Sequence, residues 1–246
     1  HEVVEPLLHA DAEVLGVEVS RLIAFVPVAD NDRRWPATLP EADYSIQGVQ
    51  VEGRRKDGSE VPLEVSLSAV VVGERRLVTA LLRDITERRR NERRTSAQQA
   101  ITRILSQSKT VEEATSGLVL ALGSHLGWQL ASIWLESTNG ARLRRAAAWR
   151  CDPVRFEATM QATESASFAR GEGLLGRVWQ SGESLWMDAF PDATVLQRSA
   201  AAREDGLLTA LACPIVVNDS VLGVIEILST NAVPKDEQLV DVIKAF

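Results

Sequence analysis

The chain has 246 residues, a formal net charge of -7, 45% hydrophobic residues and 25% charged residues. This length suits two domains that each bury a core of their own, and the balanced composition argues against wholesale disorder. The acidic excess disfavours general nucleic-acid binding, and no apolar run approaches the roughly 20 residues of a bilayer-spanning helix. We expect no nucleic-acid partner and no membrane segment here.

The two cysteines, Cys151 and Cys213, are isolated and lack the spacing of a metal site or a redox pair. Lone cysteines suit a reducing compartment, and the N-terminus lacks the basic and apolar segments of a signal peptide. We therefore expect a cytoplasmic location. The sequence begins within an expected strand and ends within an amphipathic helix, so we also expect a piece of a longer protein.

Residues 1–86 predict short helices followed by an antiparallel sheet. The helices rest on apolar residues at helical spacing, and the second strand rests on strict alternation of apolar and polar residues. The predicted elements are, in order, helices over 7–16 and 19–25, a loop over 29–43, and strands over 44–55, 61–68 and 77–85, with an Asp-Gly turn at 56–59.

The run Lys-Asp-Gly-Ser-Glu-Val-Pro at 56–62, followed by the triplet Asp84-Ile85-Thr86, resembles the C-terminal half of a PAS sensor domain. The resemblance implies that residues 1–86 form a PAS-like domain, incomplete at its N-terminus, with a ligand pocket between sheet and helices. The side chains that would face this pocket are Leu22, Tyr44, Ile46, Leu63 and Val65. The alternative that they only fill a core stays open, because buried apolar residues usually do so.

Neither haem nor flavin is supported for this PAS-like part. A haem needs an axial ligand, and His1 and His9 precede the region in which PAS haem proteins place theirs. A flavin photosensor of the LOV type needs a reactive cysteine, and the first cysteine of the chain is Cys151.

Residues 87–109 predict a long signalling helix. Asp84 or Thr86 can accept hydrogen bonds from its first backbone N–H groups, and we expect movement to enter the helix through Asp84, Ile85 and Thr86. No aromatic residues interleave with its arginines, so a solvated helix is favoured over a nucleic-acid site. A narrow apolar stripe follows on the same helix, and it predicts a homodimer through this helix. The stripe consists of Ala97, Ile101, Ile104 and Leu105.

Residues 110–246 predict a second α+β domain. The predicted order is a helix over 111–126, strands over 131–136 and 143–150 around an Asn-Gly turn, a helix over 174–180, a strand over 184–190, a helix over 193–204, a hairpin of 208–217 and 221–229, and a helix beginning at 234–237. The chain as a whole is thus expected to be α+β, with two domains that are each an antiparallel sheet flanked by helices, joined by the signalling helix.

This second half resembles a GAF domain. The residues that carry the resemblance are Gly-Glu-Gly-Leu-Leu-Gly-Arg-Val-Trp at 171–179, Leu-Trp-Met-Asp-Ala at 185–189, and Cys-Pro-Ile-Val-Val-Asn-Asp-Ser-Val-Leu-Gly-Val-Ile-Glu-Ile at 213–227. GAF domains bind small molecules between sheet and helices, or only dimerise. The glycines at 171, 173 and 176 also spell the dinucleotide fingerprint, but no apolar strand precedes them, so we expect them to shape a helix start instead.

An aromatic pocket with one acid and one base would suit a small ligand. Its candidate lining is Trp134, Trp149, Phe168, Leu174, Trp179, Trp186, Asp188 and Arg203. A tryptophan-rich core with an empty pocket remains the alternative. Cyclic-nucleotide binding is doubtful because only Asp236-Glu237 match that signature, and a covalent bilin is not supported because neither cysteine precedes a histidine. His125 near a helix end is expected to be solvated or capping rather than a haem ligand.

No nucleophile, histidine and acid set, metal cluster, kinase ATP box or cyclic-di-GMP motif is visible, so we expect neither catalytic nor metal-binding residues. The resemblances imply the sensory input module of a bacterial signalling protein, a two-component sensor histidine kinase, whose output domain follows in the same chain. Two alternatives stay open: the input region of a cyclic-di-GMP synthase or phosphodiesterase, and a dimerisation scaffold without a ligand.

Overall fold

The computed structural model of the chain describes residues 26–27, 44–54, 60–73, 75–152, 154–188, 190 and 198–244. Leu22, the helices predicted over 7–16 and 19–25, the loop predicted over 29–43 and the turn predicted at 56–59 lie outside these residues. The chain forms two compact units, His1–Arg90 and Asn91–Phe246. The boundary falls inside helix α3 (Thr86–Gln107).

The first unit contains a four-stranded antiparallel sheet in the order β1-β2-β3-β4. Its strands are β1 (Val26–Pro27), β2 (Tyr44–Arg54), β3 (Glu60–Val72) and β4 (Arg75–Asp84). The three long strands match the predicted ones, and β1 is an additional short edge strand beside β2. Alternate residues of β3 from Val61 to Ala69 are buried, so one face of the sheet is apolar, as the alternating pattern predicts.

The second unit is built on a six-stranded antiparallel sheet in the order β7-β6-β5-β10-β9-β8. Its strands are β5 (Leu130–Glu136), β6 (Leu143–Arg150), β7 (Ser167–Phe168), β8 (Leu185–Met187), β9 (Thr209–Val217) and β10 (Ser220–Ser229). The hairpin of β9 and β10 turns at Asn218 and Asp219, whose φ angles are 48° and 63°. Both residue types tolerate the left-handed conformation that a two-residue hairpin loop needs.

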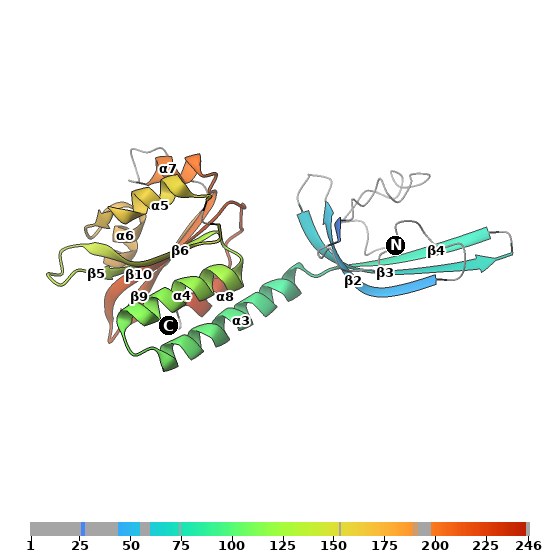
Figure 1. Cartoon of the computed structure of the whole chain (residues 1–246), viewed down its shortest axis with the longest axis horizontal. Coiled ribbons are helices and arrows are strands. Elements are labelled where there is room, and N and C mark those ends of the chain that lie inside the picture. Colours follow the sequence, from blue (N-terminus) through green and yellow to red (C-terminus); the bar gives the residue numbers. More distant parts are fainter. Residues whose placement is uncertain are drawn as a thin grey trace. The chain divides into compact units, whose positions relative to one another are not determined.

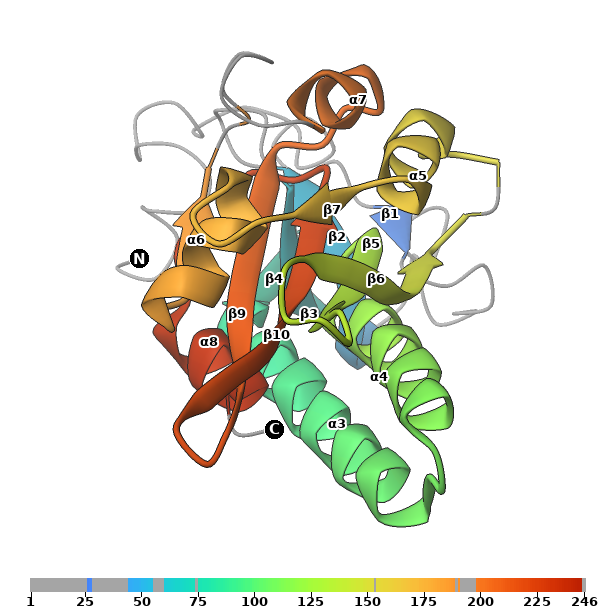
Figure 2. The ribbon, with the colours of Figure 1, turned by 90° about the vertical axis from the view of Figure 1, so that its left-hand side faces the viewer.

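Helices cover both faces of this sheet (Figures 1 and 2). One face, here the α4 face, packs against α3, α4 (Val111–Leu126) and α8 (Glu237–Lys244). The other, here the α6 face, is covered by α5 (Glu157–Glu164), α6 (Gly173–Ser181) and α7 (Ser199–Glu204). Because strand side chains alternate, each central strand contributes to both cores: Ile133 and Ile225 lie on the α4 face, Trp134 and Val224 on the α6 face.

Helix α4 begins and ends where its sequence predicts. Thr110 Oγ1 accepts a hydrogen bond from the backbone N–H of Glu113 at 3.1 Å, which satisfies one of the free donors of the first turn. Gly127 ends the helix in the left-handed conformation, with φ 74°, and its N–H donates to the carbonyl of Gly123.

Four elements of the second unit differ from the prediction. Strand β7, a two-residue strand paired with the start of β6, was not predicted. Helix α5 was not predicted, because it is short and rich in Thr, Glu and Ala and shows no clear apolar stripe. Strand β8 has three residues, fewer than the predicted strand over 184–190. Helix α7 begins at Ser199, and the preceding part of the helix predicted over 193–204 falls on residues 193–197, which lie outside the described part of the chain. Among the described helices, none has the length and apolar character needed to cross a membrane.

Candidate functional site

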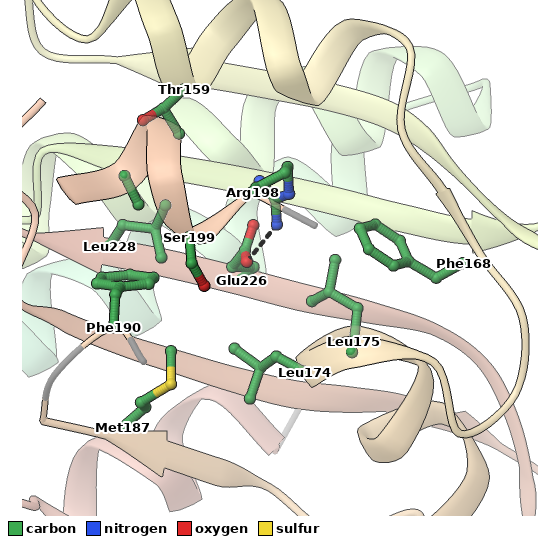
Figure 3. A pocket seen from close by; sticks show the side chains of 12 residues that line it. Thr159, Phe168, Leu174, Leu175, Met187, Phe190, Arg198, Ser199, Glu226 and Leu228 are labelled. Atoms are coloured by element: carbon green, nitrogen blue, oxygen red, sulfur yellow. Dashed lines mark hydrogen bonds and ion pairs between the residues drawn. The ribbon is translucent and has the colours of Figure 1, made fainter. Parts of the chain in front are cut away.

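A cavity lies on the α6 face, between the sheet and helices α5, α6 and α7 (Figure 3). The space between its wall atoms, counted out to the open mouth and including solvent there, is about 390 Å³. The part that admits the centre of a water molecule is about 30 Å³, room for roughly two waters. The twelve lining residues are Thr159, Phe168, Gly173, Leu174, Leu175, Met187, Phe190, Arg198, Ser199, Ala202, Glu226 and Leu228.

A buried ion pair lies in the wall of this cavity. Arg198 Nη2 donates to Glu226 Oε1 at 2.5 Å, and the two side chains are only 12% and 4% exposed. The second carboxylate oxygen, Oε2, accepts from Ser132 Oγ at 2.9 Å, and Trp134 Nε1 donates to the same Ser132 oxygen at 2.8 Å. Both oxygens of Glu226 therefore have partners, as a buried carboxylate requires.

The guanidinium of Arg198 is held from two further sides. Its Nη1 donates to Thr163 Oγ1 on α5 at 2.9 Å. The central carbon of the guanidinium, Cζ, lies 5.1 Å from the ring centre of Trp134 and 5.6 Å from that of Phe168, within cation–π range. The two rings meet edge to face with their centres 5.2 Å apart. Arg198 thus connects α5, the sheet and the aromatic wall.

Two buried hydroxyl groups at the cavity have no partner. Ser199 and Thr159 are each 1% exposed, and neither Ser199 Oγ nor Thr159 Oγ1 makes a hydrogen bond. The Ser199 oxygen points into the cavity, toward the space between Phe190, Met187 and Leu174 (Figure 3). Leaving a buried hydroxyl without a partner costs about 1–3 kcal/mol, so each such group calls for an explanation.

The six apolar residues predicted to line the pocket of the second domain separate into two groups. Phe168 and Leu174 line the cavity, and Trp134 and Trp179 belong to the same core. Trp149 and Trp186 pack on the α4 face, on the opposite side of the sheet. Strand alternation explains this, because Trp186 lies between Leu185 and Met187, both of which face the α6 side.

The predicted acid and base of the pocket, Asp188 and Arg203, are both exposed and do not line the cavity. Asp188 Oδ1 instead accepts a hydrogen bond from Trp186 Nε1 at 2.9 Å. The charged pair that the structure places there is Arg198 and Glu226, which the prediction missed. A signal for Glu226 was present: it is the one charged residue in the apolar run Val-Ile-Glu-Ile-Leu at 224–228, and a charge in a buried strand needs a partner.

The glycines at 171–176 shape the start of α6, as predicted. Gly171 and Gly173 have φ angles of 80° and 63°, in the left-handed region that favours glycine. A Cβ on Gly176 would lie 2.1 Å from the carbonyl oxygen of Ala169. The turn therefore brings the first residues of α6, Gly173 and Leu174, to the cavity wall.

Three of the five predicted pocket residues of the first unit lie on one apolar face. Ile46, Leu63 and Val65 are buried together in one cluster of β2 and β3, and Tyr44 begins β2. No cavity between them is described, so their role as a pocket stays a prediction. At the predicted relay, Asp84 Oδ1 accepts from the backbone N–H of Thr86 at 2.8 Å, and Ile85 is 2% exposed.

The described residues contain no group of three or more His, Cys, Asp and Glu side chains placed to hold a metal ion. Cys213 lies on the α4 face, away from the cavity, and burial raises the pKa of its thiol to about 11. It therefore remains a protonated, unreactive thiol at neutral pH. Cys151 is exposed and does not line the cavity either.

Comparison with known proteins agrees with this architecture. A family model described as GAF domain matches residues 108–246. The GAF domain of a phosphoenolpyruvate-protein phosphotransferase from Coxiella burnetii is 17% identical with a TM-score of 0.52, over 62% of this chain and 87% of that chain.

Two further solved structures are similar. The nlh2 GAF domain of A. aeolicus, in an inactive state, is 23% identical with a TM-score of 0.49, over 62% of this chain and 90% of that chain. The corresponding phosphotransferase GAF domain from Acinetobacter is 17% identical with a TM-score of 0.48, over 61% and 86%. No curated protein matches the chain. Because the matched family model spans more than half of its length, the chain belongs to the GAF domain family, a family of signalling and sensory modules.

Proposed function

We propose that this chain is a sensory input module of a bacterial signalling protein, a two-component sensor histidine kinase, and that it binds a small molecule in the cavity of its GAF domain. The output domain follows in the parent protein. The observation that carries the proposal is the Ser199 hydroxyl, which is buried, has no partner and points into the cavity.

Three features of the cavity support binding over an empty core. Protein interiors are close-packed and hold few voids larger than one water molecule, so a space for about two waters at a helix–sheet junction is uncommon in a simple core. Two hydroxyls of its lining remain unpaired, and a ligand oxygen beside Ser199, whose oxygen points into the cavity, would satisfy one of them. The charged groups already have partners within the protein, so a ligand can bind without breaking the Arg198–Glu226 ion pair or its hydrogen bonds.

Binding without catalysis is proposed for the same reasons. The twelve lining residues include no cysteine and no histidine, and the Cys213 thiol is buried on the other face of the sheet. Ser199 has no base within hydrogen-bond distance, so its hydroxyl is not activated as a nucleophile. The lining can orient a ligand and bind it.

The test uses a cavity-filling variant and a control on the same helix. Ala202 is 1% exposed and lines the cavity, whereas Ala200 is exposed on α7. Native mass spectrometry and thermal shifts across a panel of amino acids, organic acids, nucleotides, phenols and indoles should reveal a ligand for the unmodified chain and for Ala200→Leu. Ala202→Leu should lose it while its circular dichroism is unchanged. A ligand that both variants keep, or none for any of them, would reject the cavity as the binding site.

We further propose that the first unit is PAS-like and that α3 passes its movement on, with Asp84, Ile85 and Thr86 at the entry. Supporting this, the Asp84 carboxylate caps the first turn of α3, and Ile85 is anchored by its N–H, which donates to the Pro62 carbonyl at 3.1 Å. Asp84→Ala should cost about 0.5–2 kcal/mol of local stability. Hydrogen exchange should speed up in the first turn of α3 and stay unchanged in β9 and β10. Equal exchange in that turn would remove Asp84 from the relay.

We also propose the predicted homodimer, but through a different side of α3 from the predicted apolar stripe. Ala97 and Ile101 are fully buried in the core of the second unit and Ile104 packs against it, so these side chains already have partners within their own chain. Leu105 is 45% exposed. A dimer would therefore use the exposed side of α3, and light scattering of the intact chain and of Leu105→Glu measures it: the intact chain should be dimeric and the variant monomeric.

A further inference from the structure

We infer that the cavity on the α6 face selects a small uncharged molecule, an apolar ring or short chain that carries a hydroxyl or carbonyl oxygen, and that it excludes carboxylates and amines. This inference rests on the proposed function, because it names the class of ligand for the same cavity. It follows from the charges, the hydroxyls and the apolar wall described above.

Among the residues that the structure describes, the charged groups at the cavity already balance each other. Of its twelve lining residues only Arg198 and Glu226 are charged, and they pair with each other at 2.5 Å. Ser132 and Thr163 satisfy the remaining carboxylate oxygen and a second guanidinium nitrogen. An anion at Arg198 would lie close to the Glu226 carboxylate, and a cation at Glu226 close to the guanidinium. Either would bring an uncompensated charge into a buried site, which costs several kcal/mol.

The polar groups that remain free are neutral. Ser199 Oγ and Thr159 Oγ1 are the unpartnered hydroxyls of the wall, and a hydroxyl can both donate and accept. It therefore pairs equally with an alcohol, a phenol or a ketone. The Ser199 oxygen points into the cavity (Figure 3), so one ligand oxygen near it is the specific contact that we assign.

The rest of the wall is apolar. Phe168, Leu174, Leu175 and Leu228 are each at most 7% exposed, and Met187 and Phe190 complete the wall. These side chains match an aromatic or aliphatic body. Since the cavity admits only about two waters as it stands, a ring enters by displacing a side chain. Met187 is the flexible candidate, because methionine adapts to irregular shapes.

Four probes of nearly equal size separate these possibilities: 4-fluorobenzyl alcohol, 4-fluorotoluene, 4-fluorobenzoate and 4-fluorobenzylamine. Fluorine NMR of each probe with the intact chain gives its dissociation constant. The alcohol should bind best, and the benzoate and the benzylamine should bind at least about 100-fold more weakly. Binding of the alcohol should disappear in Ala202→Leu and persist in Ala200→Leu.

Ser199→Ala tests the specific contact without filling the cavity. This variant should bind 4-fluorobenzyl alcohol roughly 3- to 10-fold more weakly, the range of one hydrogen bond. Its affinity for 4-fluorotoluene should be unchanged. If Ser199 had only a structural role, the dissociation constants of both probes would rise equally, and that result would overturn the assignment.

The outcomes also separate this inference from the proposed function. If the benzoate or the benzylamine binds as tightly as the alcohol and Ala202→Leu abolishes it, the cavity binds ligands but the uncharged class is wrong. If no probe binds while a charged compound of the metabolite panel does so in the same cavity, the inference again fails and the proposed function stands. A phenol of the panel that binds there would support the inference. If neither probes nor panel bind, both fail.

Discussion

At the scale of single residues, the buried charge of Glu226 is stabilised by its hydrogen-bond and ion-pair partners. It lies in β10 between Ile225 and Ile227, both buried on the opposite face. Its carboxylate is 4% exposed and is held by Arg198 and Ser132. Removing one member of a buried pair leaves the other charge without compensation, which is far more costly than the pair itself is stabilising.

Glu226→Gln should therefore lower the free energy of unfolding by about 3–5 kcal/mol, because the Arg198 guanidinium stays buried without a counter-charge. Urea unfolding followed by circular dichroism measures it. The control is Lys235→Gln, which breaks the exposed ion pair with Glu237, whose side chains are 61% and 70% exposed. That change should stay within about 0.5 kcal/mol. Equal losses for the two variants would show that the Arg198–Glu226 pair is not buried as described.

The sequence predicted part of the cavity lining and missed its charged pair, for a physical reason. Phe168 and Leu174 were predicted as part of an aromatic pocket with one acid and one base, and both line the cavity. Trp149 and Trp186 were assigned to the same pocket although alternation along a strand places neighbouring side chains on opposite faces. Arg198 could not be assigned, because its partner in β10 lies 28 residues away and only the folded sheet brings the two together.

At the scale of elements, the packing of α4 on the sheet depends on one glycine. A Cβ on Gly123 would lie 2.0 Å from the ring of Trp149, a distance that real side chains do not reach. The missing side chain lets the Trp149 ring of β6 lie against the helix. This close approach is a property of the helix–strand pair and is not visible in the sequence of either element.

Gly123→Ala should lower the free energy of unfolding by about 1–3 kcal/mol, the cost of overpacking a core, although alanine favours the helix by about 1 kcal/mol. In a Trp149→Ala background the clash is gone, so the same change should be neutral or stabilising. A double-mutant cycle by urea unfolding isolates this coupling. If Gly123→Ala costs the same in both backgrounds, the ring of Trp149 does not lie where the structure places it.

The elements that the sequence predicted well are those with a strong local signal. The hairpin of β9 and β10 combines long apolar runs with an Asn-Asp turn, and α4 has a cap at each end. Helix α5 lacks such a local signal. Phe156, which precedes its first residue, makes no side-chain capping hydrogen bond. Tertiary contacts stabilise it instead, since the backbone N–H of Thr159 donates to Asp205 Oδ2 at 2.7 Å. Such long-range partners explain why its existence could not be predicted locally.

At the scale of the whole molecule, α3 is part of the hydrophobic core of the second unit. The GAF family model begins at residue 108, after the end of α3, yet Ala97, Ala100 and Ile101 are buried in the core of the second unit. Arg94 also donates to Asp236 and, at 2.5 Å, to Gln238 Oε1. Asp236 Oδ1 in turn accepts from the N–H of Leu239 in α8 at 3.0 Å. Helix α3 therefore contacts the start of α8, the last described helix.

A fragment of residues 91–246 should accordingly be more stable than one of residues 108–246, although both contain the matched family region. The longer fragment keeps the buried side chains of α3 and the Arg94–Asp236 pair, and we expect a difference of roughly 2–5 kcal/mol in the free energy of unfolding by urea. Within the longer fragment, Ile101→Ala should cost about 2–5 kcal/mol. Leu105→Ala, at a side chain 45% exposed on the same helix, should stay within about 0.5 kcal/mol. Fragments of equal stability would mean that α3 does not belong to the core of the second unit, and the proposed relay through α3 would lose its structural support.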